Sequence, residues 1–265
     1  MKLFSLNVAL FEQNNAQLAD FIQAQQPDII CLQEVTKKID DQTKPEFISQ
    51  PAIDQASPAL AYNFFAPIWV MENFNKDDFH GDEHFQFELG GWAELGNYVR
   101  SRFPISQGKN VFVQNEFRYV TDWSRWPEED VRAVQVTDID LPETKLRILN
   151  YHGIWSRDKL GTDLTLQACQ KIKQLALEVD YPAIICGDFN LFPDTDSMQV
   201  FADQFESLVD TYKIRTTRPE SNELSAHKRN IVDYILVSKG VKVSDFAVLD
   251  VAISDHLPLV VEFTV

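Results

Sequence analysis

The segment Ala183–Asn190 is the feature that most limits what this chain can fold into. It consists of four apolar residues and a glycine, followed by an aspartate and an asparagine two positions apart. A short unbroken apolar run is typical of a strand that is buried on both faces. Because side chains repeat every second residue along a strand, we expect Asp188 and Asn190 to point to the same side. The pattern predicts polar groups aimed into a pocket, and an Asx turn after the strand is the alternative.

The chain opens with the same combination of apolar strand and polar end. The sequence predicts a strand, a helix and a second strand, over residues 2–8, 14–26 and 28–34. Asn7 lies near the end of the first strand, Pro27 stops the helix, and Glu34 closes the second strand with a carboxylate. This order indicates a βαβ-like unit with polar residues at both strand exits.

Strands predominate in the rest of the chain. The patterns predict strands over residues 62–70, 91–100, 105–113, 131–139, 145–151, 231–237, 241–249 and 259–265, and helices over 162–177 and 197–205. We expect the strands flanking 101–104 to pair, and those flanking 140–143 to form a hairpin that delivers His152. Gly153 then gives the backbone freedom to turn. With no internal repeat and no linker rich in glycine or serine, residues 1–265 are predicted to form a single α+β sandwich domain.

Composition narrows the class of protein. Apolar residues make up 45% of the chain, enough for a sizeable core. The three cysteines lie in apolar or helical stretches, and we expect buried thiols in a reducing compartment. The sequence shows no export signal and no apolar run of about 18 residues, so we expect a cytoplasmic monomer without a membrane span.

Charge argues against one class of partner. The formal net charge is −16, whereas a protein that holds duplex DNA by electrostatics should be basic. DNA would repel the chain unless bound metal and a local patch of arginine and lysine reversed the sign. The charge is therefore evidence against a non-specific nuclease.

Eight polar side chains recur at or beside the ends of apolar segments. They are Asn7, Glu34, His152, Asp188, Asn190, Asp233, Asp255 and His256. Carboxylates are hard oxygen ligands that suit Mg²⁺ or Mn²⁺, and the sequence shows no cysteine–histidine cluster with zinc spacing. His256 beside Asp255, with Asp233 in the preceding apolar segment, offers a base and a carboxylate to orient it. Each residue alone has a structural explanation, but the recurrence indicates one catalytic site.

Five segments in order along the chain resemble the endonuclease/exonuclease/phosphatase superfamily. These metal-dependent phosphoesterases include DNase I, exonuclease III-like repair enzymes, neutral sphingomyelinases and inositol-polyphosphate 5-phosphatases. The segments are Ser5–Val8, Leu32–Val35, Gly187–Asn190, Val232–Ser238 and Ser254–Leu259. Gly96–Ile105 is similar to the family's central strand and turn. Each motif is weak alone, and the five in order are specific.

The resemblance implies a fold and a cofactor. The expected fold is a four-layer α/β/β/α sandwich of the DNase I type, with two sheets packed face to face and helices outside. One or two Mg²⁺ or Mn²⁺ ions are expected at the sheet ends. Glu34 would ligate the metal, with Asn7 and Asp255 supporting it.

The resemblance also implies roles in catalysis. Asp188 and Asn190 would position the attacking water and the phosphate. His256, oriented by Asp233, would act as base or as phosphate ligand. His152 matches a position where a histidine or asparagine contacts the phosphate.

The substrate is less constrained. Tyr151–Trp155 and the following Gly161–Asp163 are similar to a subgroup of small bacterial members, and this similarity carries no substrate with it. Trp155, Arg125 and Arg229 are candidate substrate-binding residues, since aromatic rings stack on bases and arginine holds phosphate. The alternative is that the tryptophan covers the sandwich edge and the arginines are ordinary surface residues.

Three functions are compatible with these residues. The first is a Mg²⁺-dependent phosphodiesterase or phosphatase acting on a small substrate, such as a nucleotide or a single-stranded nucleic acid. The second is a DNA endonuclease or repair nuclease, and the third is a non-catalytic binding module that keeps the fold. The complete set of acids and histidines argues against the third. A basic groove over the strand ends would favour the second over the first.

Overall fold

The strands lie in two sheets. The computed structural model describes residues 1–9, 15–75, 86–121, 128–219 and 230–265. The first sheet contains β1 (Lys2–Asn7), β2 (Ile29–Lys38), β3 (Tyr62–Asn75), β4 (Gln86–Ser101), β6 (Arg118–Val120), β12 (Lys242–Val248) and β13 (Leu259–Thr264). The second contains β5 (Ile105–Gln114), β7 (Arg132–Asp140), β8 (Lys145–His152), β9 (Ala183–Asp188), β10 (Phe205–Ser207) and β11 (Asp233–Ser238). Within the described residues the strand orders are β12-β13-β1-β2-β4-β3-β6 and β10-β11-β9-β8-β7-β5.

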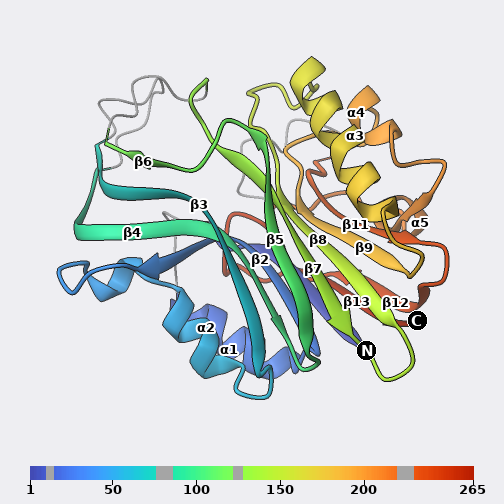
Figure 1. Cartoon of the computed structure of the whole chain (residues 1–265), viewed down its shortest axis with the longest axis horizontal. Helices are drawn as coiled ribbons and strands as arrows, with labels where there is room; N and C mark the ends of the chain where they lie inside the picture. Colours follow the sequence, from blue (N-terminus) through green and yellow to red (C-terminus); the bar gives the residue numbers. More distant parts are fainter. Residues whose placement is uncertain (10–14, 76–85, 122–127, 220–229) are drawn as a thin grey trace.

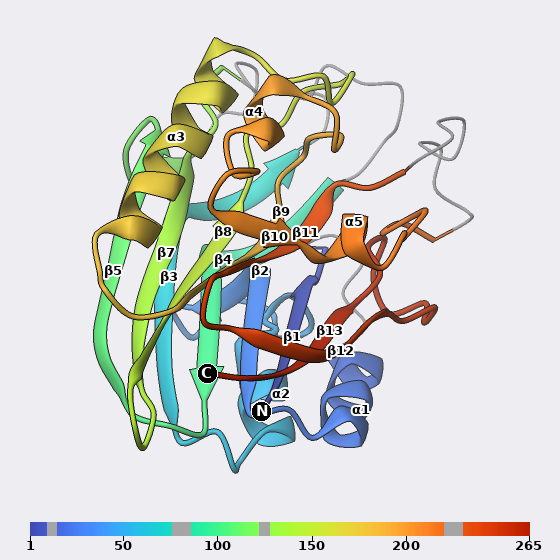
Figure 2. The same ribbon diagram turned by 90° about the vertical axis from the view of Figure 1, so that its right-hand side faces the viewer.

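Helices cover the outer side of each sheet (Figures 1 and 2). Beside the first sheet lie α1 (Asn15–Gln25) and α2 (Gln50–Ala56), which a 3₁₀ turn at Pro45–Phe47 precedes. Beside the second lie α3 (Asp163–Leu177), α4 (Asp196–Gln199) and α5 (Leu208–Thr211). The inner faces of the sheets contact each other where β1 and β2 cross β8 and β9. The predicted four-layer α+β sandwich is confirmed.

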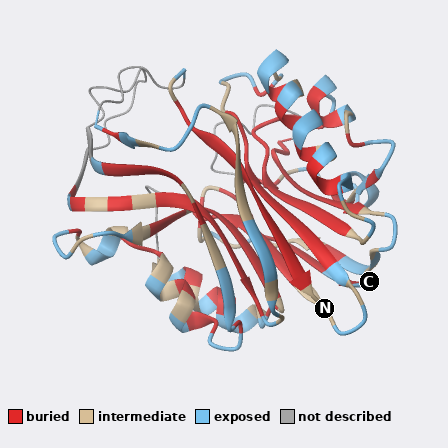
Figure 3. Ribbon diagram, viewed as in Figure 1, coloured by how far each residue is buried: buried red, intermediate tan, exposed pale blue. Residues whose placement is uncertain are grey.

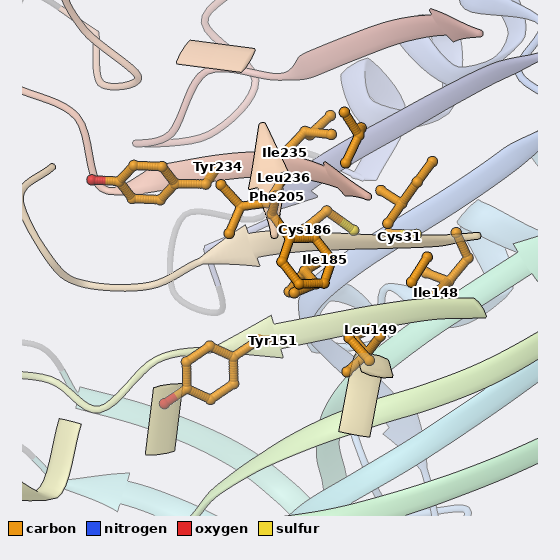
Figure 4. Packing of buried hydrophobic residues seen from close by; sticks show 14 of the residues in the cluster. Cys31, Ile148, Leu149, Tyr151, Ile185, Cys186, Phe205, Tyr234, Ile235 and Leu236 are labelled. Carbon is orange, nitrogen blue, oxygen red and sulfur yellow. The ribbon is translucent and has the colours of Figure 1, made fainter. Parts of the chain in front are cut away.

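The core explains why the central strands are apolar along their whole length. All six residues of β9 are buried, as are most of β7 and β8 (Figure 3). Cys31 of β2 and Cys186 of β9 lie in one apolar cluster that spans both sheets (Figure 4). A separate cluster joins α1 and α2 to β1 and β2, with Phe4, Ile22 and Ile53 at its centre. Burial of these side chains on both faces of each sheet supplies the main driving force for the layered fold.

Two of the predicted strand pairings are correct and one is wrong. β1 and β2 are parallel around α1, and β7 and β8 form the predicted antiparallel hairpin. β4 and β5 do not pair, because residues 101–104 carry the chain from the first sheet to the second. Hydrogen bonds hold this crossing at both ends, from Arg102 N–H to the carbonyl of Asp28 and from Asp140 N–H to that of Pro104. Alternation along a strand does not indicate which sheet the strand joins.

The three cysteines lie in the core. Cys31, Cys169 and Cys186 are free thiols and are buried, as predicted. In the described part of the chain, no helix has the length and apolar character needed to cross a membrane.

Candidate active site

The ends of β8 and β9 bring two of the predicted site residues together. The two strands are parallel, and their register sets His152 opposite Asp188. A Cβ atom on Gly187 would lie 2.0 Å from a carbonyl oxygen of β8, and one on Gly153 would lie 2.1 Å from the carbonyl oxygen of Phe189. The predicted role of Gly153 was backbone freedom, but its φ does not lie in the left-handed region. The close approach of the two backbone segments excludes a side chain at this glycine.

Asp188 is a buried carboxylate between amides and histidines. Its Oδ2 accepts hydrogen bonds from Nδ2 of Asn7 and of Asn190, both at 3.2 Å. Nε2 of His256 lies 3.5 Å from the same oxygen, and Nε2 of His152 lies 3.8 Å from it. Burial alone raises the pKa of Asp188, but the nearby positive charges, with His256 first among them, hold it well below its usual range. The carboxylate is therefore ionised at neutral pH.

Asn190 faces Asp188 for a reason that differs from the predicted one. β9 ends at Asp188 and Asn190 has φ +56°, so strand alternation does not apply. The backbone N–H of Asn190 donates to Oδ1 of Asp188 at 2.8 Å, which is the Asx turn considered as the alternative. The Asx turn and the pair of facing polar groups occur together.

Glu34 reaches the site from a bulge and not from the end of a strand. β2 continues to Lys38, and its register with β4 shifts around Glu34, which has φ +59°. The prediction that Glu34 closes the strand is wrong, because a bulge redirects its side chain while pairing resumes beyond it. Nδ2 of Asn7 donates to Oε1 of Glu34 at 3.0 Å. The amide of Asn7 thus joins the carboxylates of Glu34 and Asp188.

His256 is held by Asp233, the first residue of β11. Nδ1 of His256 lies 2.8 Å from Oδ1 of Asp233, and its backbone N–H donates to Oγ of Ser254 at 3.1 Å. Burial and a nearby arginine lower the pKa of His256, but the surrounding carboxylates outweigh them and raise it to about 9. His256 is therefore a cation at neutral pH.

His152 has the opposite environment. Its Nδ1 accepts a hydrogen bond from Arg132 at 3.1 Å, because a guanidinium can act solely as a donor. Arg132 is also paired with the buried carboxylate of Asp130 at 2.7 Å. Burial, and then the charge of Arg132, hold the pKa of His152 well below its usual range. The ring is neutral, and its Nε2 carries the proton 3.5 Å from Oε1 of Glu34.

Three cations at the site were missed by sequence reasoning. Arg132 follows Asp130 at the start of a buried strand, and such a charged pair is a signal that was available. Arg218 donates to Oδ2 of Asp255 at 2.5 Å and to its carbonyl oxygen at 3.2 Å. Lys159 is 3% exposed and donates from Nζ to Oδ1 of Asn190 at 2.6 Å. Arg218 and Lys159 lie in loops, where no spacing rule indicates an inward side chain.

Most of the predicted site residues contact one another in the structure. Asn7, Glu34, His152, Asp188, Asn190, Asp233 and His256 form one network of contacts. Asp255 is joined to it through His256, whose Nε2 lies 3.7 Å from Oδ1 of Asp255. Trp155 is half-buried, and Nζ of Lys159 lies 4.8 Å from its ring centroid. Arg125 and Arg229 lie outside the described residues.

The donor atoms fit a hard divalent cation. Atoms of Asp188, Asp233 and His256 lie within 4.8 Å of one another, a cluster that could hold a metal ion. In that cluster Nδ1 of His256 is already bonded to Asp233. The neighbouring carboxylates of Glu34 and Asp188 both accept hydrogen bonds from Nδ2 of Asn7, whose own oxygen accepts from the N–H of Ala9. Carboxylate oxygens are ligands that Mg²⁺ prefers, so these two carboxylates could hold the ion.

A comparison with protein families decides the identity. Residues 4–256 match the model of the Endonuclease/Exonuclease/phosphatase family. The chain belongs to this family. Members of the family hydrolyse phosphate esters, so the family and the fold together support a phosphoesterase. A search of curated proteins found no match.

Solved structures of the same family share the fold. A family protein from Leptotrichia buccalis C-1013-b matches with a TM-score of 0.69 at 18% identity, covering 100% of both chains. One from Beutenbergia cavernae DSM 12333 also matches at 0.69 and 18% identity, over 99% of this chain and 71% of that one. The mannosyl-6-phosphatase Bt3783 from Bacteroides thetaiotaomicron matches at 0.65 and 16% identity over 100% of both chains. This chain therefore has the DNase I-like fold of the family.

Proposed function

We propose that this chain is a Mg²⁺-dependent phosphoesterase that hydrolyses a small phosphate ester, a nucleotide or a short single-stranded nucleic acid by attack of water. The placement of Asp188 supports the proposal best. An ionised, buried carboxylate lies against Nε2 of two histidines and Nδ2 of two asparagines, at the ends of strands from both sheets. The mannosyl-6-phosphatase among the similar structures is consistent with hydrolysis of a phosphate ester on this fold.

The charge state of each side chain indicates its role in hydrolysis. Asp188, as an acceptor without a proton, would orient the attacking water by accepting a hydrogen bond from it. His256 is cationic and would bind a phosphoryl oxygen, which favours the phosphate-ligand role over the base role. His152 would offer its neutral Nε2–H to the same group. Donors that are fixed before the reaction stabilise the charge that grows in the transition state.

A bound Mg²⁺ would neutralise charge on the phosphoryl oxygens and on the leaving group. Glu34 would hold the ion, with Asn7 and Asp255 in support. Hydrogen bonds from Asn7 keep the carboxylate of Glu34 at the end of β1, and Arg218 fixes the carboxylate of Asp255. Mn²⁺ has the same preference for oxygen and would serve as a substitute.

The test compares hydrolysis in Mg²⁺ and in EDTA. The substrates are p-nitrophenyl phosphate, bis-p-nitrophenyl phosphate, plasmid DNA and short RNA. We expect Mg²⁺-dependent turnover of the small esters, and losses of about 10²-fold or more for His256→Ala and for Glu34→Gln. Circular dichroism would verify that both variants are folded.

The other outcomes separate the alternatives. Activity on plasmid DNA alone would refute the small-substrate proposal and favour a nuclease. Silence on every substrate in the presence of Mg²⁺ would favour a non-catalytic module that retains the fold.

A further inference from the structure

Lys159 differs from Arg132 and Arg218 in having no acidic partner among the described residues. Arg132 is paired with Asp130 at 2.7 Å, and Arg218 with Asp255 at 2.5 Å. For Lys159, no carboxylate of the described ranges lies within 4.0 Å of Nζ. Its hydrogen bond is to the neutral amide oxygen of Asn190, at 2.6 Å. Among the described residues, the positive charge of Lys159 is therefore not compensated by a carboxylate at close range.

The loop holds Lys159 in a fixed position. Its backbone has φ +56°, which is unusual for a residue other than glycine. Its carbonyl oxygen accepts a hydrogen bond from the N–H of Phe192 at 3.0 Å, so the loop is tied to the segment that follows Asn190. The ammonium group also lies 4.8 Å from the ring centroid of Trp155. These contacts keep the side chain 97% buried, where a lysine near the surface would otherwise extend into water.

A buried ammonium group without an acidic partner is costly unless an anion joins it. Two further observations place that anion at the active site. Lys159 takes the oxygen of the Asn190 amide, which leaves Nδ2 of Asn190 turned toward Asp188. Burial lowers the pKa of Lys159 to about 7, and the charge of Asp188 offsets this effect only in part.

We propose that Lys159 binds the phosphoryl group of the substrate and makes the enzyme prefer phosphomonoesters, with their dianionic terminal phosphate, over phosphodiesters. This inference rests on the proposed phosphoesterase function. A phosphomonoester carries close to two negative charges at pH 7, and a diester carries one. Lysine binds phosphate as a point charge, so an uncompensated ammonium group gains more from the dianion.

The experiment compares kcat/KM for p-nitrophenyl phosphate and bis-p-nitrophenyl phosphate in Mg²⁺ at pH 6.5. Lys159→Met removes the charge and keeps the length, and Lys159→Arg keeps the charge. Lys213→Met is the matched control, because Lys213 also has positive φ, at +55°, but is exposed, and its backbone N–H donates to the carbonyl of Asp210. We expect Lys159→Met to lower the monoester value by about 10- to 100-fold, the range for a hydrogen bond to a charged group, and the diester value much less. Lys159→Arg should recover most of the preference.

Binding of inorganic phosphate provides a second measurement that does not require turnover. Calorimetry should show Lys159→Met binding phosphate about 10- to 100-fold more weakly than the wild type, with Lys213→Met unchanged. Equal losses on both esters, or unchanged phosphate affinity, would overturn the assignment of Lys159. A wild type that binds phosphate through Lys159 but hydrolyses neither ester would refute the proposed function and leave the phosphate-binding role supported. A wild type that prefers the diester would refute the selectivity.

Discussion

His152 and His256 lie on either side of Asp188, and the partner of each Nδ1 atom sets the charge of the ring. Arg132 donates to Nδ1 of His152, which fixes the proton on Nε2 and opposes a second proton. Asp233 accepts from Nδ1 of His256 and favours the imidazolium. Environments that push two titratable groups apart in pKa assign them separate roles. Here one histidine is a neutral donor and the other is a cation.

The raised pKa of His256 predicts a pH dependence of stability. Its folded-state pKa of about 9 lies above the usual value of 6.5, so folding favours the protonated form. The stabilisation is complete below pH 6.5 and is lost as the pH rises through 9. In EDTA, the difference in unfolding free energy between wild type and His256→Gln should shrink by on the order of 3 kcal/mol across this window.

Urea unfolding at several pH values measures this difference. The comparison with the variant is needed because Lys159, whose pKa is lowered to about 7, contributes the opposite slope above pH 7 in both proteins. Parallel curves for the two proteins would show that His256 is not protonated in the fold.

The pair of Asp130 and Arg132 predicts a large cost for removing one partner. Both side chains are buried, and Arg132 also supports Nδ1 of His152. We expect Arg132→Met to lower the unfolding free energy by about 3–5 kcal/mol, because the carboxylate is left buried without its partner. The double variant Asp130→Asn, Arg132→Met should recover part of this loss. If the double variant is as unstable as the single one, the pairing is not the cause.

At the scale of elements, the sequence predicted which residues meet but not how the backbone brings them together. The apolar runs of β1, β2 and β9 were visible as strands, and so were the polar ends of β1 and β9. The bulge at Glu34 and the positive φ of Asn190 were not predicted. Glutamate rarely adopts a left-handed conformation, and asparagine, although enriched there, adopts other conformations at most positions. The crossing after β4 was also missed, since local alternation carries no information about sheet partners.

The junction of β8 and β9 predicts that Gly153 tolerates no side chain. A Cβ atom would lie 2.1 Å from the carbonyl oxygen of Phe189, and the N–H of Gly153 donates to the carbonyl of Asp188 at 2.6 Å. We expect Gly153→Ala to cost about 1–3 kcal/mol of stability through overpacking. It should also lower kcat by 10-fold or more, because a shift of about 1 Å at a reacting group costs up to 10²-fold.

Ser156→Ala is the matched control for this prediction. Ser156 lies in the same loop, and its buried hydroxyl has no hydrogen-bond partner among the described residues. Thermal unfolding and steady-state kinetics should show this variant close to the wild type. Normal stability and activity in Gly153→Ala would mean that the junction is looser than the contact distances indicate.

At the scale of the whole molecule, the fold and the charge lead to different conclusions about the substrate. The order of five motifs along the chain indicated the family, and residues of all five meet in one network of contacts. The same order is compatible with nucleases and with phosphatases. Lys159 and Arg218, the cations in loops, bear on the choice between these two classes but carry no periodic signal in the sequence. Two of the three predicted substrate-binding residues, Arg125 and Arg229, lie outside the described residues.

The net charge of −16 predicts weak binding of duplex DNA. Non-specific binders typically reach a Kd of about 10⁻⁴–10⁻⁶ M at physiological salt by releasing counterions from phosphates. At the site, Arg132 and Arg218 are already neutralised by their carboxylate partners, so few charges are free to replace those counterions. Fluorescence anisotropy with a labelled duplex in Mg²⁺ should therefore give a Kd weaker than this range. Tight binding with a steep loss of affinity in salt would instead indicate a basic groove. Loss of that binding in Arg125→Ala or Arg229→Ala would show that these arginines contribute to it.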